Sequence, residues 1–226
     1  ESPKTGTATS MRKIAFLALG IAAVLSIAIL STPSATAAID GSAHDFETAT
    51  WNSGDQICAP CHTPHGGSLT VTDAPLWSHT LTTATYTTYT SDTINATMGA
   101  PTGVSKLCLS CHDGSVAYDS FYGVGTPNAT VATGSALIGL NLNAHHPVSF
   151  TYDDTLASTD GELHAPTTTS SGITGGGNID DDLLFGAGSD QLECASCHDV
   201  HNSAAVGSLL VKSNTGSALC LTCHDK

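Results

Sequence analysis

The chain has 226 residues, is 40% hydrophobic but only 5% aromatic, and carries 6 basic against 20 acidic residues. Such an acidic surface repels nucleic acid and anionic membranes, so we expect neither as a partner. The charge serves either solubility alone or contact with cationic partners, metal ions or oxidised minerals, and both interpretations stay open.

The first part of the chain has the organisation of an export signal. Residues 11–13 are Met-Arg-Lys, residues 14–30 form an uncharged apolar run, and residues 35–37 are Ala-Thr-Ala, which suits a signal peptidase. A permanent membrane anchor is the alternative, but the apolar run is at the short end of the spanning range. We expect residues 1–10 to be an upstream, non-native extension and residues 11–37 to be a cleaved signal peptide. Residues 38–226 would keep three lysines against nineteen acidic residues, a net charge of −16.

Few regular elements are predicted in the exported part. The segment 82–90, rich in Thr and Tyr, predicts an extended or short β segment, and residues 105–112 predict a short helical turn. Residues 113–193 are rich in Gly, Thr, Asn and Asp and lack a clear periodic element, which in an ordinary domain would argue against a compact fold. The aspartate run 180–182 is interpreted as a solvated loop, with cation binding as the alternative.

One five-residue pattern, Cys-x-x-Cys-His, occurs four times, and all eight cysteines fall inside it. It is the attachment motif of c-type haem. Two thiols at this spacing reach the two vinyl groups on one edge of a porphyrin, and the imidazole that follows becomes the proximal iron ligand. Zinc sites, a thioredoxin-like motif and a disulfide scaffold are the alternatives, but none of them needs a His after every second Cys. We therefore predict four covalently attached haem c groups, on Cys58, Cys61, Cys108, Cys111, Cys194, Cys197, Cys220 and Cys223, with proximal ligands His62, His112, His198 and His224.

The motifs form a functional repeat. Each half of the exported part offers a lone His, then a motif extended to His-x-x-His, then a plain motif. We expect one tetrahaem domain over residues 38–226, with one haem pair in 38–125 and the other in 126–226. The porphyrins would supply much of the buried apolar surface that the chain itself lacks.

The second axial ligand of each iron is expected to be histidine. Only Met98 remains as a methionine after export, so at most one haem could have His/Met ligation. Seven histidines remain for four positions, so histidine on both sides of every iron is the natural interpretation. These seven are His44, His65, His79, His145, His146, His164 and His201.

Spacing and the repeat favour four of these seven. His65 and His201 each lie three residues after a proximal His, on nearly the same face of a short helical turn, so each must bind the iron of a different haem. His44 and His146 are the remaining pair that the repeat matches, and Pro147 stiffens the backbone after His146.

The other three histidines are in reserve or on the surface. His79 and His145 are reserve distal ligands, and His164 is expected at the surface. The proximal histidines should donate their second ring nitrogen to a carbonyl or a carboxylate. The residues directly after them are candidate acceptors, with solvent-facing charge as the alternative: Asp113, Asp199 and Asp225.

Five stretches resemble a known family. They are His44-Asp-Phe, residues 57–65, residues 107–114, His146-Pro-Val and residues 194–201. They are similar to doubled-CxxCH multihaem cytochromes and, more narrowly, to the outer-surface tetrahaem cytochromes of the OmcE type, which polymerise into conductive filaments. The resemblance implies mostly irregular backbone with a few short helices and minor β structure, organised around a stacked haem chain. It also implies a distal His donated between neighbouring subunits.

Histidine on both faces leaves no open iron position, so electron transfer at low potential is expected rather than catalysis. We expect an exported electron carrier at the cell surface that joins identical subunits head to tail into a filament. Its partners would be redox partner cytochromes and an external electron acceptor. A soluble periplasmic shuttle is the alternative. A multihaem reductase is disfavoured because no Cys-x-x-Cys-Lys variant occurs and histidines are in surplus.

Overall fold

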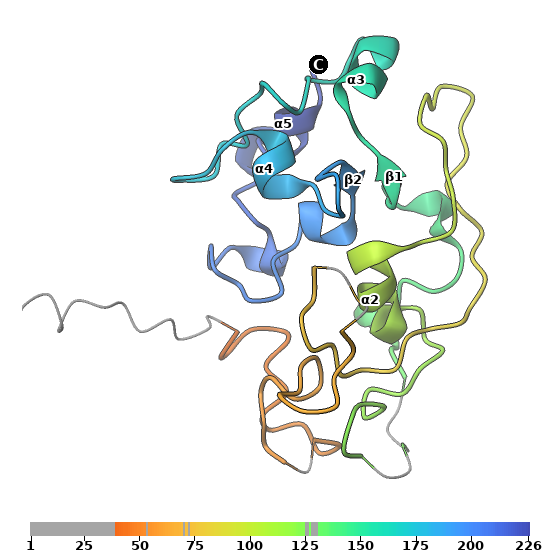
Figure 1. Ribbon diagram of the computed structural model, residues 1–226, viewed down its shortest axis with the longest axis vertical. Coiled ribbons are helices and arrows are strands. Elements are labelled where there is room, and N and C mark those ends of the chain that lie inside the picture. The colour runs from red at the N-terminus through yellow and green to blue at the C-terminus, as the bar shows by residue number, and fades with distance from the viewer. Residues whose placement is uncertain (1–38, 53, 70, 72, 125–126, 128–130) are drawn as a thin grey trace, which may run out of the picture. The chain divides into compact units, whose positions relative to one another are not determined.

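The computed structural model describes residues 39–52, 54–69, 71, 73–124, 127 and 131–226, so the predicted extension and signal peptide lie outside the described residues. Ala37–Lys226 form one compact unit. The predicted fold class is confirmed, because irregular backbone dominates and the helices and the single small sheet are short (Figure 1). No helix in the described ranges has both the length and the apolar sequence that crossing a bilayer requires.

The regular elements of the described part are brief. The α-helices are α2 (Gly103–His112), α3 (Asp154–Asp160), α4 (Ile179–Leu183) and α5 (Cys220–Cys223). The strands are β1 (Phe150–Thr151) and β2 (Gln191–Leu192). The 3-10 helices are η1 (Gly134–Ala136), η2 (Leu142–Ala144), η3 (Cys194–Ser196), η4 (Gly207–Leu209) and η5 (Thr215–Ser217).

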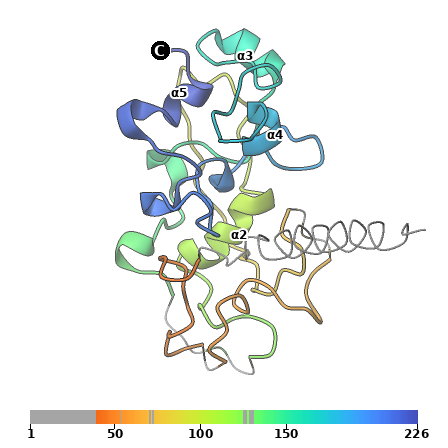
Figure 2. The same cartoon turned by 90° about the vertical axis from the view of Figure 1, so that its left-hand side faces the viewer.

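The hydrophobic core lies in the C-terminal half. β1 and β2 pair antiparallel with Phe150 opposite Leu192, so both apolar side chains point to one face. α3 begins after Asp153, whose side chain accepts a hydrogen bond from the Leu156 N–H, and ends at the left-handed Gly161. The helices α3, α4 and α5 lie near one another in both ribbon views (Figures 1 and 2). The core residues are Phe150, Tyr152, Ala157, Ile179, Leu183, Leu184 and Leu192.

Residues 113–193 show no clear periodic element in the sequence, yet they contain regular structure and the hydrophobic core. This stretch contains β1, α3, α4 and β2, and it supplies every residue of the core cluster. Elements of two to seven residues are too short to leave a periodic signal in a sequence rich in Gly and Thr. Packing between them, rather than propensity within them, defines these elements.

The aspartate run is also not a loop, because it forms the first turn of α4. The Asp181 carboxylate accepts a hydrogen bond from the Asn178 N–H at 3.2 Å. The Asp182 carboxylate accepts from the Gly177 N–H at 2.7 Å and from the Ser171 hydroxyl. Acidic side chains in a first turn satisfy free N–H groups and favour the helix dipole, which explains the run without a cation.

The helix predicted at 105–112 is confirmed and begins two residues earlier, as α2. The predicted β segment at 82–90 does not form a strand, although Thr87 makes a single parallel bridge to Asn141. Its polar side chains instead form hydrogen bonds at the C-terminal end of α2. The hydroxyls of Thr82 and Tyr86 both donate to the buried carboxylate of Asp113 at 2.6 Å.

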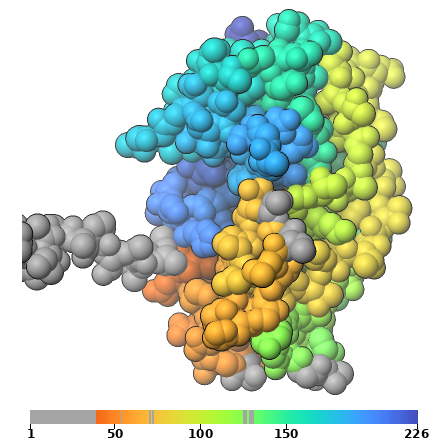
Figure 3. Space-filling model, viewed as in Figure 1, coloured from red at the N-terminus to blue at the C-terminus, as the bar shows by residue number. Residues whose placement is uncertain are grey.

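The segment after it, residues 91–100, runs along the C-terminal half of the chain (Figure 3). The Asn95 side chain donates a hydrogen bond to Asp160 at 2.9 Å, and Ala96 and Met98 pack against the hydrophobic core. An irregular segment from the first half thus depends on the second half for its position.

Candidate functional site

Each Cys-x-x-Cys-His motif contains one helical turn. The His N–H donates to the carbonyl of the first Cys in three of them, at 2.8 Å for His62, 3.1 Å for His198 and 3.0 Å for His224. The remaining motif, which ends at His112, lies at the C-terminal end of α2. A single turn brings residues i, i+3 and i+4 to one side, as attachment of two thiols and one imidazole to the same porphyrin requires.

The two His-x-x-His motifs also share a closing loop. In the first, His62 bridges Trp77, the Thr63 N–H donates to Leu76, and the Ser78 N–H donates to Cys61. Because the chain forms this bridge, it leaves the helical turn at the proximal His.

The third motif repeats this arrangement bond for bond. His198 bridges Leu210, the Asp199 N–H donates to Leu209, and the Val211 N–H donates to Cys197. Leu209 has a left-handed φ of 55°, and the equivalent Leu76 has one of 57°. The premise that His65 and His201 continue a helical face is therefore wrong, because each follows a bridge and not a helix.

The fourth motif forms the same type of bridge with a segment that precedes it. His224 bridges Leu163, the Asp225 N–H donates to Glu162, and the His164 N–H donates to Cys223. Only the second motif departs from the pattern, because α2 continues through His112.

Three proximal imidazoles have their Nδ1 atom fixed by a main-chain carbonyl oxygen. The distances are 2.8 Å from His62 to Pro75, 2.6 Å from His112 to Ala136, and 3.0 Å from His198 to Ser208. A hydrogen bond at Nδ1 fixes the tautomer and leaves Nε2 as the free ligand atom. No residue type marks these carbonyls, so they could not be identified from the sequence.

The aspartates after the motifs have other partners. Asp113 accepts from Thr82 and Tyr86, as described above, and the Asp199 carboxylate accepts from the N–H groups of His201 and Ser203. Asp225 is exposed. Carbonyl oxygens rather than these carboxylates therefore hold the proximal rings of the first three motifs.

Three proximal histidines each have a predicted distal histidine as a ring neighbour. Two imidazoles that bind one metal from opposite sides, with each nitrogen about 2.0 Å away and each ring centre roughly 1.2 Å beyond, have ring centres about 6.4 Å apart. The observed ring-centre separations are close to this value, so the distances fit a shared iron. The pairs are His112 with His44 at 5.9 Å, His62 with His201 at 6.3 Å, and His224 with His146 at 6.3 Å.

Aromatic packing fixes the segment that carries His44. The His44 ring contacts Phe46, Phe46 contacts Trp51, and Trp51 stacks on Tyr118. Burial, followed by the nearby His112 and His198, lowers the pKa of His44 to about 4, which keeps the ring neutral and able to ligate. The Nδ1 atom of His44 is buried and has no hydrogen-bond partner among the described residues.

His198 differs from the other three proximal histidines. Among the described residues, no second imidazole ring packs against it as His201 packs against His62. His65 is exposed, and so is the reserve ligand His145. The structure therefore places three of the four favoured distal histidines, His44, His146 and His201, beside a proximal His.

The remaining histidines have other surroundings. Both ring nitrogens of the reserve ligand His79 face carbonyl oxygens, with Nδ1 2.9 Å from Thr80 and Nε2 3.1 Å from Ala117. His164 is half-buried rather than fully on the surface. Met98 lines an apolar pocket together with His145, His146, Leu109, Leu142 and Cys194.

The eight cysteines are all free, and neighbouring motifs bring their thiols close together. The interaction with the Cys194 thiol, followed by burial, raises the pKa of the Cys108 thiol. Burial, followed by the charge of Cys61, raises the pKa of Cys111 to about 12. Burial, followed by the charge of Cys197, raises the pKa of Cys223 to about 11. Thiols of motifs that are consecutive in the chain therefore lie close enough to shift one another's pKa.

Comparison with known families supports the assignment of haem-attachment motifs in the C-terminal part of the chain. The family model described as the doubled CXXCH motif matches residues 187–226, which contain the third and fourth motifs. No curated protein matches the chain. Doubled CXXCH motifs indicate covalently bound haem c and support electron transfer by a multihaem c-type cytochrome.

Proposed function

We propose that the chain is an exported tetrahaem c-type cytochrome that carries electrons along closely spaced haems and polymerises into an extracellular conductive filament. The observation that carries the proposal is the set of three imidazole pairs, each with the separation that one shared metal requires. Bound haem c would supply one-electron chemistry at an iron whose axial positions are both filled. Catalysis is not part of the proposal.

The polypeptide would act as a covalent sheath. Each pair of thiols would hold one porphyrin edge, and the main-chain carbonyls of Pro75, Ala136 and Ser208 would orient the proximal rings. The thiol neighbours Cys61–Cys111, Cys108–Cys194 and Cys197–Cys223 support a continuous series from the first motif to the fourth.

The unpaired His198 supports filament formation. A proximal His without a ring contact of the kind that the other three make needs its distal ligand from another segment, and a neighbouring subunit would supply it. A contact between unlike surfaces of identical subunits gives an open filament when its rotation does not close. Export to the cell surface is consistent with attachment of c-type haem outside the bacterial cytoplasm.

One observation favours the alternative of a soluble periplasmic shuttle. His201 of the third motif lies against His62 of the first, so the repeat would let His65 serve His198 within the same chain. All four irons would then be ligated in a single subunit.

Electron microscopy of purified cell-surface material, combined with a haem assay, tests the proposal. We expect filaments of this chain, one c-type haem for each motif, and ferric spectra that are low-spin throughout. Dissociated subunits should lose the low-spin signal of one haem. Monomers that retain every low-spin signal would support the shuttle, and fewer haems than motifs would overturn both.

A further inference from the structure

Glu193 directly precedes the third motif, and it is the buried acidic residue that joins this motif to the second. Its side chain is 2% exposed. The Oε2 atom accepts hydrogen bonds from the Ser105 N–H at 3.1 Å and from the Ser149 hydroxyl at 2.8 Å. Ser105 lies in the first turn of α2, the helix that carries the second motif. The carboxylate therefore connects two haem-attachment segments that are far apart in the sequence.

The first turn of α2 is built to receive this carboxylate. The residue before the helix, Thr102, makes no side-chain capping bond, so Glu193 satisfies a free N–H group in its place. Gly103 has a left-handed φ of 47°, and a Cβ atom there would lie 2.6 Å from Glu193 Oε1. Glycine is therefore required for the close approach.

Further hydrogen bonds hold the contact from both sides. The Cys194 N–H donates to the Ser105 hydroxyl at 2.9 Å, and the Glu193 N–H donates to the Ser196 hydroxyl at 2.9 Å. The Ser149 N–H donates to the Leu192 carbonyl at 2.6 Å. α2 and η3 lie against each other as a result (Figure 1). Burial raises the pKa of Glu193, and the hydrogen bonds from Ser105 and Ser149 oppose this shift.

The Glu193 contact also determines where the second and third haem-attachment segments lie. Cys108 is one turn further along α2 from Ser105, and Cys194 follows Glu193, so this junction brings the two attachment segments together. Each thiol is predicted to hold one porphyrin edge. The junction thus lies between the haem pair of the first half and that of the second.

We infer that Glu193 is a positioning residue that fixes the second and third porphyrins against each other through α2 and Ser149. The inference rests on the proposed electron-transfer function and names the residue on which transfer between the two haem pairs depends. Because the hydrogen bonds of the carboxylate join these two attachment segments, removal of its charge should affect their two haems more than the other two.

The test uses the full-length, haem-loaded chain with Glu193→Ala and Glu193→Gln, and Glu47→Gln as the control, because Glu47 is exposed. Visible circular dichroism reports coupling between adjacent porphyrins, and a potentiometric titration at mildly alkaline pH reports each haem. We expect Glu193→Ala to lose at least half of the exciton couplet. Glu193→Gln keeps the size and one acceptor, so it should retain most of the couplet while two redox transitions shift to higher potential. The control should match the parent.

An unchanged couplet and unchanged potentials in Glu193→Ala would overturn the inference, as would an equal shift of all the haems. If Glu193→Ala does not load haem, Ser149→Ala keeps the charge and both motifs but removes one donor, and its couplet should weaken. An unchanged couplet in Ser149→Ala would equally overturn the inference. The unmodified protein distinguishes failure of the proposed function from failure of this inference. Fewer than four haems in the unmodified protein would contradict the proposed function. Four haems in the unmodified protein, with an unchanged Glu193 variant, would contradict the role of Glu193 alone.

Discussion

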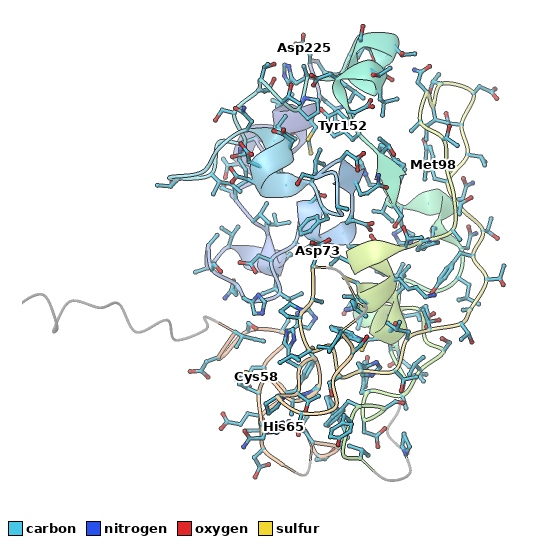
Figure 4. All side chains as sticks on the ribbon, in the orientation of Figure 1. Cys58, His65, Asp73, Met98, Tyr152 and Asp225 are labelled. Atoms are coloured by element: carbon cyan, nitrogen blue, oxygen red, sulfur yellow. The ribbon has the colours of Figure 1, made fainter. Side chains whose placement is uncertain are left out.

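The first and third motifs have the same local structure in different surroundings. Both use one helical turn, a bridge at the proximal His, a left-handed Leu before the bridge partner and a carbonyl at Nδ1. His65 and His201 are both exposed, but the His201 ring lies against His62, whereas His65, labelled in Figure 4, has no such ring neighbour among the described residues. The motif and its closing loop therefore define the proximal side of each site, and the remainder of the chain decides what reaches the distal side.

The packing around the two motifs differs as well. The third motif follows β2 directly and contacts α2 and α4, next to the hydrophobic core. The first motif lies in irregular loops, held by the Trp77 bridge and by hydrogen bonds such as that from the Asn52 side chain to the Phe46 carbonyl. A region that lacks an apolar core should depend more on an attached porphyrin for its stability, because the porphyrin would supply buried apolar surface.

The largest effect should therefore follow loss of the first porphyrin. We expect the double variant Cys58→Ala/Cys61→Ala to lose one haem and the hydrogen-exchange protection of residues 39–78. The matched variant Cys220→Ala/Cys223→Ala should also lose one haem but keep protection in the core at residues 150–192. Mass spectrometry with hydrogen exchange measures both. Equal loss of protection across the two variants would show that the halves do not differ in this way.

The second-largest effect should follow removal of a distal histidine. His201→Ala should convert one haem from low-spin to high-spin, because the ring against His62 is lost. Electron paramagnetic resonance of the ferric protein measures the change. His164→Ala is the control, because the hydrogen bonds of His164 with Cys223 and Tyr152 use its backbone and would remain, and it should keep the parent spectrum. A fully low-spin His201→Ala protein would contradict the pairing.

The variant His65→Ala tests whether His198 takes its distal ligand from the same chain or from a neighbouring subunit. In an isolated subunit that needs a partner for His198, this variant should leave the spectrum of the subunit unchanged. In a self-sufficient shuttle it should add one high-spin haem. Size-exclusion chromatography coupled to absorption spectroscopy distinguishes the two outcomes.

The core gives a smaller, purely structural effect. Ile179 is 0% exposed, so Ile179→Ala should destabilise the folded state by about 2–5 kcal/mol, from lost burial and the cavity left behind. Leu69 is 84% exposed, and Leu69→Ala should change the free energy of unfolding by less than about 0.5 kcal/mol. Denaturant titration followed by circular dichroism measures both values. A small cost for Ile179→Ala would mean that the porphyrins, and not this cluster, stabilise the C-terminal half.

The smallest effect concerns the polar contacts of the first half. Tyr86→Phe removes one of the hydroxyls that donate to Asp113, while Thr82 still donates to it. We expect a loss of about 1 kcal/mol in the free energy of unfolding. Tyr122→Phe, at an exposed tyrosine, should have almost no effect. Equal values for the two variants would show that the Asp113 network does not stabilise the first half.

Local patterns were predictable from the sequence, and contacts between distant segments were not. The spacing of Cys108, Cys111 and His112 predicted a helical turn, which lies in α2. The core around Ile179 escaped prediction because two-residue strands leave no periodicity. The role of Asp181 at a helix start escaped because a run of three acids is also typical of a loop.

The candidate functional site shows the same difference between predictable local patterns and unpredictable contacts between distant segments. The sequence singled out His44, His146 and His201, and the structure places each beside a proximal His. Spacing alone could not assign partners, because a partner depends on how segments far apart in the chain meet. Glu193 gave no signal either, since its importance comes from its burial against Ser105 and Ser149.

The carbonyl oxygens behind His62, His112 and His198 have an evolutionary consequence. A peptide oxygen belongs to every residue type, and it neither gains nor loses a proton in the physiological range. Point mutation therefore cannot delete these acceptors, and changes of acidity in the environment cannot switch them off. The proposed electron carrier would therefore keep the orientation of its proximal rings while the exposed side chains around them change during evolution.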